Sequence, residues 1–201
     1  MTSSSVTGST THPGNGPARD PGDERRPDLQ RWDWTIMKSF AYGSNLCRGW
    51  LLNRVPSATY EVVAQLPEHQ LRFHKRSKDG SGKADAHYTG DTNDNVWGLV
   101  VNVPDNERGA LDRAEGLNHG YEERKVTVHD EEGNSYQVSA YVAAASHIDA
   151  SLRPFDWYLR LISEGATSQG LPSAYVATLT TELSVADHDT ERIRKAEVRC
   201  G

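Results

Sequence analysis

A turn near position 43 carries residue types suited to binding an anion. Residues 40–46 read Phe-Ala-Tyr-Gly-Ser-Asn-Leu, between an apolar run over 34–40 that predicts a strand and a predicted short helix over 46–54. Gly43 permits backbone torsions that other residues resist, and we expect Ser44 or Asn45 to cap the helix. Free backbone N–H groups at such a helix start bind anions. Taken alone, the pattern also fits an ordinary capped turn.

Glu115 is a second residue whose side chain could take part in a reaction. It follows a predicted helix over residues 106–114, and Gly116 stands where a glycine ends many helices. The helix dipole disfavours a negative charge at this end, and such departures from local preference concentrate at functional sites. The sequence therefore indicates a carboxylate available for acid–base chemistry. A solvated glutamate at a helix end is the alternative interpretation.

The elements that must position these residues come in clusters. Strands are predicted at 60–66, 70–73, about 84–88, 96–103, 121–129 and 136–145, and further helices from Pro154 and over 171–179. Because strands and helices are grouped rather than strictly alternating, an α+β fold is favoured over an α/β fold.

The chain of 201 residues has the length of one domain. Residues 1–30 are rich in Ser, Thr, Gly, Pro, Asp and Arg, and their aliphatic side chains are few: Val6, Ala18 and Leu29. Such a segment buries too little apolar surface to offset the entropy of ordering. We therefore expect a disordered tail over 1–30, a folded domain over 31–183 and a charged extension over 184–201.

The formal net charge of −6 argues against nucleic acid as a partner, since the one dense basic patch, residues 74–78, is short. No apolar run approaches the length of a membrane span, and residues 1–30 lack the apolar region of a secretory signal. These features predict a cytoplasmic protein.

Metals, cofactors and disulfides are not expected. The two cysteines, Cys47 and Cys200, offer no disulfide framework, and a bond between them is not expected in a reducing cytosol. The eight histidines are scattered and no zinc-binding spacing occurs. The glycine-rich stretch 80–85 ends in Gly-Lys but lacks the spacing of a phosphate-binding P-loop.

The segment over residues 40–46 resembles the signature that opens γ-glutamylcyclotransferases. Further segments follow in that family's order: Arg54–Ala58, Val96–Val100, Leu111–Leu117 with Gly120 and Tyr121, and Gly165–Tyr175. The resemblance spans about residues 36–181. It implies a small mixed β-barrel with surrounding helices and a cofactor-free reaction of γ-glutamyl peptide and glutathione metabolism, whose substrate is a small molecule. In that reaction, the α-amine of a γ-glutamyl compound attacks its own γ-carbonyl, giving 5-oxoproline and a free amine.

The resemblance also implies roles for particular residues. Glu115 matches the catalytic glutamate of the family, and we expect it to take a proton from the attacking amine and return it to the leaving amine. The residues expected to bind substrate are Ser39, Phe40, Ala41, Tyr42, Gly43, Ser44, Tyr121 and Tyr141. Core packing is the alternative role for the tyrosines, and helix capping is the expected role of Asn45.

Other positions are expected to serve packing, or depart from the family. Phe155, Trp157 and Tyr158 are expected to pack in the core. Asp85 stands where the animal members carry an apolar residue, which leaves its role open.

Two other functions remain candidates. One is the same chemistry on γ-glutamylamines or on a γ-glutamyl-protected biosynthetic intermediate. The other is a non-catalytic binding module on the same fold, against which Glu115 argues. A homodimer is the candidate assembly.

Overall fold

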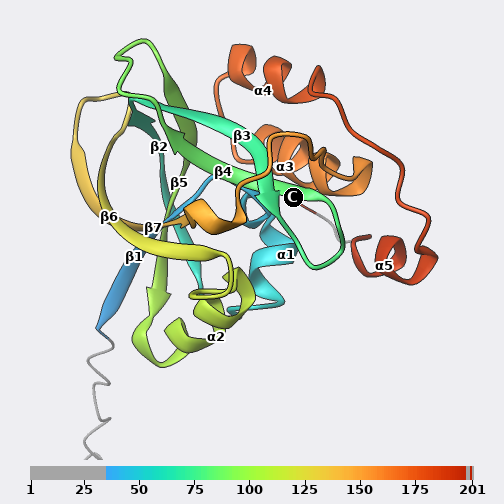
Figure 1. The fold of residues 1–201 in the computed structure, drawn as a ribbon. Helices are drawn as coiled ribbons and strands as arrows, with labels where there is room; N and C mark the ends of the chain where they lie inside the picture. Colours follow the sequence, from blue (N-terminus) through green and yellow to red (C-terminus); the bar gives the residue numbers. More distant parts are fainter. Residues whose placement is uncertain (1–34, 198–199, 201) are drawn as a thin grey trace, which may run out of the picture. The chain divides into compact units, whose positions relative to one another are not determined.

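The computed structural model describes residues 35–197 and residue 200, and its centre is a closed five-stranded barrel (Figure 1). The strands follow the order β1-β5-β2-β6-β7, and a parallel contact between Ser39 of β1 and Ser139 of β7 closes the barrel. All other barrel pairings are antiparallel. The barrel strands are β1 (Ile36–Ala41), β2 (Thr59–Pro67), β5 (Asn95–Pro104), β6 (Tyr121–His129) and β7 (Ser135–Ala143). The predicted α+β class and mixed barrel are confirmed.

A separate two-stranded sheet lies against the barrel. It consists of β3 (His69–Arg76) and β4 (Gly82–Tyr88), which pair antiparallel with a register shift between Arg72 and Lys75. The Ala143 N–H at the end of β7 donates to the Asp85 carboxylate at 2.7 Å, so a buried side chain of β4 ties this sheet to the barrel.

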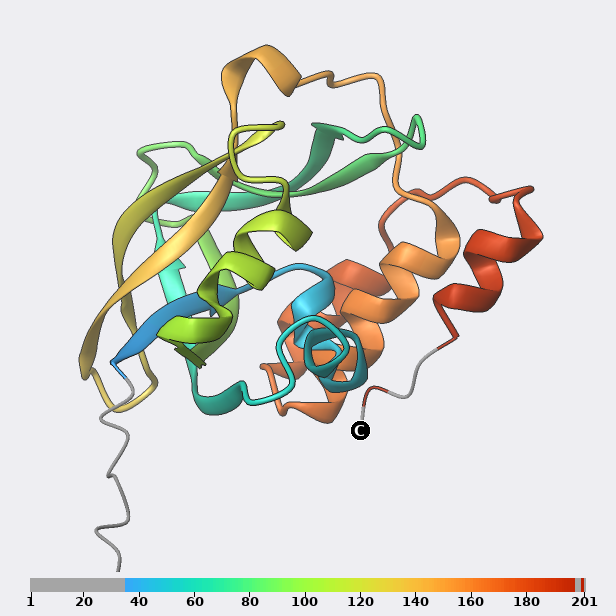
Figure 2. The same cartoon turned by 90° about the horizontal axis from the view of Figure 1, so that it is seen from below.

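In chain order the helices are η1 (Ser44–Leu46), α1 (Arg48–Leu52), α2 (Asp105–Glu115), η2 (Ala145–His147), α3 (Asp156–Ser168), α4 (Ser173–Thr180) and α5 (Thr190–Lys195). Helices α1, α3, α4 and α5 gather on one side of the barrel, and α2 lies apart from them (Figures 1 and 2). The core consists mainly of aliphatic barrel side chains, such as those of Val100, Val103 and Val138, together with the inner face of α3. No helix within the described residues combines the length and apolar character needed to cross a bilayer.

Helix α3 lies directly on the turn that follows β1. A Cβ atom placed on Gly165 would stand 2.5 Å from both the carbonyl carbon of Leu46 and the backbone nitrogen of Cys47. Only a glycine allows the two backbones to approach this closely. The helix therefore fixes the position of the turn at residues 43–47.

Two expectations about this turn and its neighbours are wrong. Neither η1 nor α1 receives a side-chain cap, so the capping role expected of Ser44 or Asn45 is not observed. Cys47 and Cys200, 153 positions apart, form a disulfide. Their separation along the chain gives no sign of the bond, because only the tertiary fold makes the two cysteines neighbours.

The segment expected to form a charged extension contains α5, which Asp189 caps through the N–H of Arg192. Asp187 accepts hydrogen bonds from Arg192 and from the indole of Trp157, and thereby joins this segment to α3. The predicted tail over residues 1–30 lies outside the described residues.

Candidate active site

One narrow cavity, the inner cavity, brings together all nine residues that the sequence analysis selected. Its volume is about 30 Å³. The residues that line it are Ser39, Phe40, Ala41, Tyr42, Gly43, Ser44, Asn45, Ala84, Glu115, Tyr121, Tyr141 and Tyr158. They come from the end of β1 and the following turn, from β4, from the end of α2, from the facing ends of β6 and β7, and from α3.

The turn at residues 43–45 presents backbone donors to the inner cavity. The N–H groups of Gly43, Ser44 and Asn45 make no hydrogen bond to a described residue, whereas those of Leu46 and Cys47 close the turn on the carbonyls of Gly43 and Ser44. Backbone N–H groups that converge on a cavity stabilise an anion. The turn can therefore hold a carboxylate or a developing oxyanion.

Glu115 is the last residue of α2, which ends on Gly116 in the left-handed conformation at φ 71°. One carboxylate oxygen, Oε1, accepts hydrogen bonds from Asn45 Nδ2 at 2.7 Å and from Arg54 Nη1 at 3.1 Å. The other oxygen, Oε2, makes no hydrogen bond within the part of the chain that the structure describes. Two donors thus offset the unfavourable helix end and orient the side chain, while one oxygen stays available for proton transfer.

Asn45 and Arg54 form a unit with Glu115, which sequence reasoning missed. Arg54 Nη1 donates to Asn45 Oδ1 at 2.7 Å, and its guanidinium lies 5.0 Å from the ring centre of Trp50. Instead of capping a helix, Asn45 uses both ends of its amide between Arg54 and Glu115. No local pattern in the sequence signals this arrangement, since residues 45, 54 and 115 meet only in the fold.

The hydroxyls of the three selected tyrosines are engaged within the protein. Tyr42 donates to the carbonyl of Tyr141, Tyr121 donates to the carbonyl of Ala84 at 2.6 Å, and Tyr141 donates to Asp112 at 2.6 Å. Burial raises the pKa of all three phenols, so they stay protonated. Their rings line the cavity and their hydroxyls fix its walls.

Tyr158 of α3 also faces the inner cavity, although its helical spacing predicted core packing alone. Its hydroxyl oxygen accepts the Ala84 N–H at 3.2 Å. Burial raises the pKa of Tyr158 to about 12, so its hydroxyl is protonated at neutral pH. The packing expectation was incomplete, because a buried helix face can also form the wall of a cavity.

A larger outer cavity of about 360 Å³ adjoins the inner one and shares Ser44, Glu115, Tyr121 and Tyr158 with it. Basic side chains dominate its remaining wall: Arg54, Lys75, Lys83, Arg192 and Lys195. Trp157, expected to serve packing alone, lines it as well. Glu115 therefore stands where the two cavities meet.

Lys75 is unusual among these cations. Lys83 is paired with Asp79 at 2.8 Å, and Arg192 is paired with Asp187. Lys75 is 92 % buried, because only 8 % of its surface is exposed, yet its ammonium makes no hydrogen bond or ion pair with a described residue. It lies 4.5 Å from the ring centre of Tyr121. Burial lowers the pKa of Lys75, which is the expected response of an ammonium without a carboxylate partner.

The chain is similar in sequence to proteins of known family. The model of the AIG2-like family matches residues 95–179. A γ-glutamylcyclotransferase of Bos taurus is 32 % identical over 167 residues, covering 77 % of this chain and 82 % of the relative. The chain belongs to the γ-glutamylcyclotransferase family.

Further members of the family agree with this placement. The γ-glutamylcyclotransferase of Homo sapiens is 31 % identical over 68 % of this chain and 73 % of its own. A solved structure titled "Gamma-glutamyl cyclotransferase" superposes with a TM-score of 0.71 at 28 % identity, covering 80 % of this chain and 97 % of its own. The resemblance first seen at residues 40–46 is thus confirmed over most of the fold.

Proposed function

We propose that this γ-glutamylcyclotransferase converts γ-glutamyl amino acids to 5-oxoproline and a free amino acid, with Glu115 moving the protons. The observation that carries the proposal is one juxtaposition. The Glu115 carboxylate and the free N–H groups of residues 43–45 meet in the inner cavity, with one carboxylate oxygen unengaged. A binding module would need no such unengaged base, so the non-catalytic alternative is not favoured.

The chemical steps follow from this geometry. The Glu115 carboxylate removes one proton from the nitrogen of the neutral α-amine as that nitrogen forms its bond to the γ-carbonyl carbon. The carbonyl oxygen becomes an oxyanion, which the N–H groups of residues 43–45 stabilise. The protonated Glu115 then gives its proton to the leaving nitrogen as the original C–N bond breaks, so one carboxyl group acts as base and then as acid.

A substitution at Glu115 tests the mechanism. We expect Glu115→Gln to lower kcat for γ-glutamyl-alanine by about 10²–10⁴-fold, the range for loss of a general acid–base, because the amide cannot accept the proton. The assay is release of 5-oxoproline, with circular dichroism as the fold check. The exposed Glu164→Gln is the matched control and keeps full activity. Full turnover by Glu115→Gln would refute the mechanism.

The outer cavity bears on the choice between amino acid and amine as the leaving group. It adjoins the inner cavity at Glu115, and it is lined by Lys75, whose ammonium has no ion-pair partner among the described residues. A leaving amino acid carries a carboxylate that can pair with this ammonium, whereas a simple amine offers no negative charge. We therefore favour γ-glutamyl amino acids over γ-glutamylamines.

Substitution of Lys75 tests this preference. In Lys75→Met, we expect the KM for γ-glutamyl-alanine to rise about tenfold or more, the effect of losing one charge-assisted hydrogen bond. The KM for a γ-glutamyl-alkylamine should change by less than about twofold. The exposed Lys78→Met is the control. An equal rise in KM for both substrates would show that Lys75 does not bind the carboxylate of the leaving amino acid.

The cellular setting follows as a further proposal. We propose that the protein works in the cytoplasm on γ-glutamyl peptides of glutathione metabolism, as a homodimer. Subcellular fractionation tests the location, and light scattering of the purified protein tests the assembly.

A further inference from the structure

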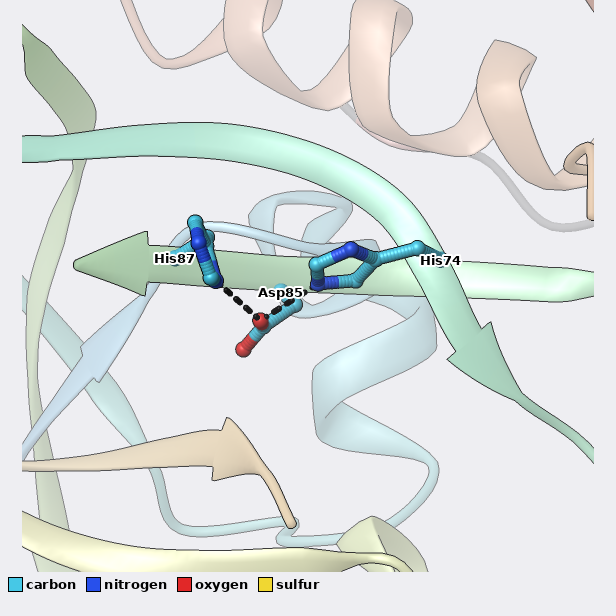
Figure 3. Close-up of side chains that lie close together, drawn as sticks. All are labelled: His74, Asp85 and His87. Carbon is cyan, nitrogen blue, oxygen red and sulfur yellow. Dashed lines mark hydrogen bonds and ion pairs between the residues drawn. The ribbon is translucent and has the colours of Figure 1, made fainter. Parts of the chain in front are cut away.

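Three side chains with metal-ligating atoms lie close together in the β3–β4 sheet, outside the candidate active site. His74 comes from β3, and Asp85 and His87 come from β4 (Figure 3). Successive side chains of a strand point to opposite faces. Accordingly Ala84 lines the inner cavity, whereas Asp85 and His87 line a different cavity of about 500 Å³. Sequence spacing gave no sign of this cluster, because the strand pairing brings residue 74 to residues 85 and 87.

The two imidazoles lie on either side of one carboxylate oxygen (Figure 3). His74 Nε2 lies 2.8 Å from Asp85 Oδ2, and His87 Nδ1 lies 3.9 Å from the same oxygen. The three ligand atoms all lie within 4.8 Å of one another. The other oxygen of Asp85 accepts the Ala143 N–H, which fixes the carboxylate with Oδ2 toward the histidines. Such outer hydrogen bonds are what orient metal ligands in proteins.

A buried His–Asp pair by itself would account for His74 and Asp85, but it leaves His87 unexplained. The distance of 3.9 Å from His87 to Asp85 is too long for a hydrogen bond. Within the described residues, the His87 ring accepts and donates no hydrogen bond. Its ring packs edge-on against that of His74, with centroids 5.2 Å apart. A third nitrogen therefore stands beside the pair with its coordinating capacity unused.

We propose that His74, Asp85 and His87 form a binding site for a first-row transition-metal dication such as Zn²⁺ or Co²⁺. Two imidazoles and one carboxylate are a donor set that these ions favour, whereas Mg²⁺ and Ca²⁺ require mainly oxygen ligands. The adjoining cavity gives an ion access and room for water at the remaining coordination position. The role that the sequence analysis left open for Asp85 is then that of the central ligand.

The change needed to bind is small. Ligands bonded at about 2.0–2.1 Å in tetrahedral geometry lie about 3.4 Å apart. The three ligand atoms lie within 4.8 Å of one another, so no pair must approach by more than roughly 1.4 Å, and the His74 and Asp85 atoms, 2.8 Å apart, must separate by roughly 0.6 Å. His87 is half-buried and makes no hydrogen bond to a described residue, so rotation of its side chain provides the larger movement.

Metal titration of the full chain tests the proposal, and it does not depend on the proposed enzymatic function. The protein is prepared without a histidine tag, treated with EDTA and dialysed. We expect one equivalent of Zn²⁺ to bind by calorimetry, one equivalent of Co²⁺ to give a visible absorption band, and Mg²⁺ and Ca²⁺ to give no binding signal. Absence of Zn²⁺ and Co²⁺ binding below millimolar concentration would overturn the proposal.

Variants locate the ion. His87→Ala removes a proposed ligand that makes no hydrogen bond to a described residue, so we expect the variant to fold. We expect its Zn²⁺ affinity to fall at least about 100-fold. This is the upper end of the affinity loss seen when a residue that only hydrogen-bonds to a metal ligand is mutated. The exposed His119→Ala is the matched control and should bind as the parent protein does. Equal affinity of His87→Ala and the parent protein would place the ion elsewhere and refute the site.

Discussion

At the scale of single residues, the proposed mechanism rests on how the two oxygens of the Glu115 carboxylate differ. Oε1 of Glu115 is held by Asn45 and Arg54, whereas Oε2 has no hydrogen-bond partner among the described residues, and Glu115 lines the same cavity as residues 43–45. The sequence identified Glu115 through the helix-end argument and the family resemblance. Its two partners could not be predicted, because nothing near residues 45 and 54 in the sequence records that the fold brings them to residue 115.

Arg54 is predicted to position the carboxylate of Glu115, the proposed general acid–base. Arg54→Met removes one of the two donors to Oε1 and leaves the Glu115 side chain free to take other rotamers. We expect kcat to fall about tenfold or more, in line with the loss of a hydrogen bond to a charged group, with a smaller change in KM. Steady-state kinetics on γ-glutamyl-alanine measure both, and the exposed Arg113→Met is the control.

A positioning role also predicts partial rescue. Arg54→Lys retains a donor near Glu115 and should recover part of kcat. If Arg54→Met keeps the parent kcat, the ion pair contributes only to packing.

At the scale of elements, α3 does more than cover the barrel. Its glycine contact sets the position of the turn at residues 43–47, and its Tyr158 forms part of the cavity wall. The pattern of apolar residues predicted this helix, and a helical period shows which face is buried. It does not show whether that face meets other side chains or a cavity, which is why Tyr158 was assigned to packing alone.

Gly165→Ala tests the contact between α3 and the turn. The added methyl group would meet the backbone of Leu46 and Cys47 at 2.5 Å, so the helix must move away from the turn. We expect a loss of about 1–3 kcal/mol in the free energy of unfolding, the usual effect of overpacking, and a lower kcat. Urea denaturation and the 5-oxoproline assay provide the readouts.

Gly109→Ala is the matched control for Gly165→Ala. Gly109 lies inside α2, where a Cβ atom meets only the flexible end of Arg113 at 3.4 Å. There alanine should raise stability by about 0.5–1 kcal/mol, because glycine is the poorer helix former. Loss of stability in Gly109→Ala but not in Gly165→Ala would contradict the close approach.

At the scale of the whole molecule, the disulfide links the turn after η1 to the last described residue of the chain. Cys47 and Cys200 are separated by 153 positions, and a crosslink across so long a loop strongly restricts the unfolded chain. Neither spacing nor composition signals the pair. The contact depends on the path of the chain through α3, α4 and α5 back to the turn.

Reduction of this bond is predicted to destabilise the protein. We expect the free energy of unfolding to fall by about 2–4 kcal/mol in the presence of a reductant, the typical effect of losing a disulfide. Urea denaturation with and without reductant measures the change. Cys200→Ser should match the reduced protein and should not respond to reductant. Identical midpoints for the oxidised and reduced protein would show that the bond adds no stability.

The sequence by itself determined the α+β class, the positions of most strands and helices, and nine of the twelve residues that line the inner cavity. The fold class and the elements are consequences of local periodicity and turn chemistry, whereas the site residues follow from the resemblance of short motifs to those of γ-glutamylcyclotransferases. Only the tertiary structure decided the partners of Glu115, the unpaired ammonium of Lys75, the disulfide and the cluster of His74, Asp85 and His87. Each of these depends on contacts between distant segments, and such contacts are set by how the barrel closes and how the helices pack around it.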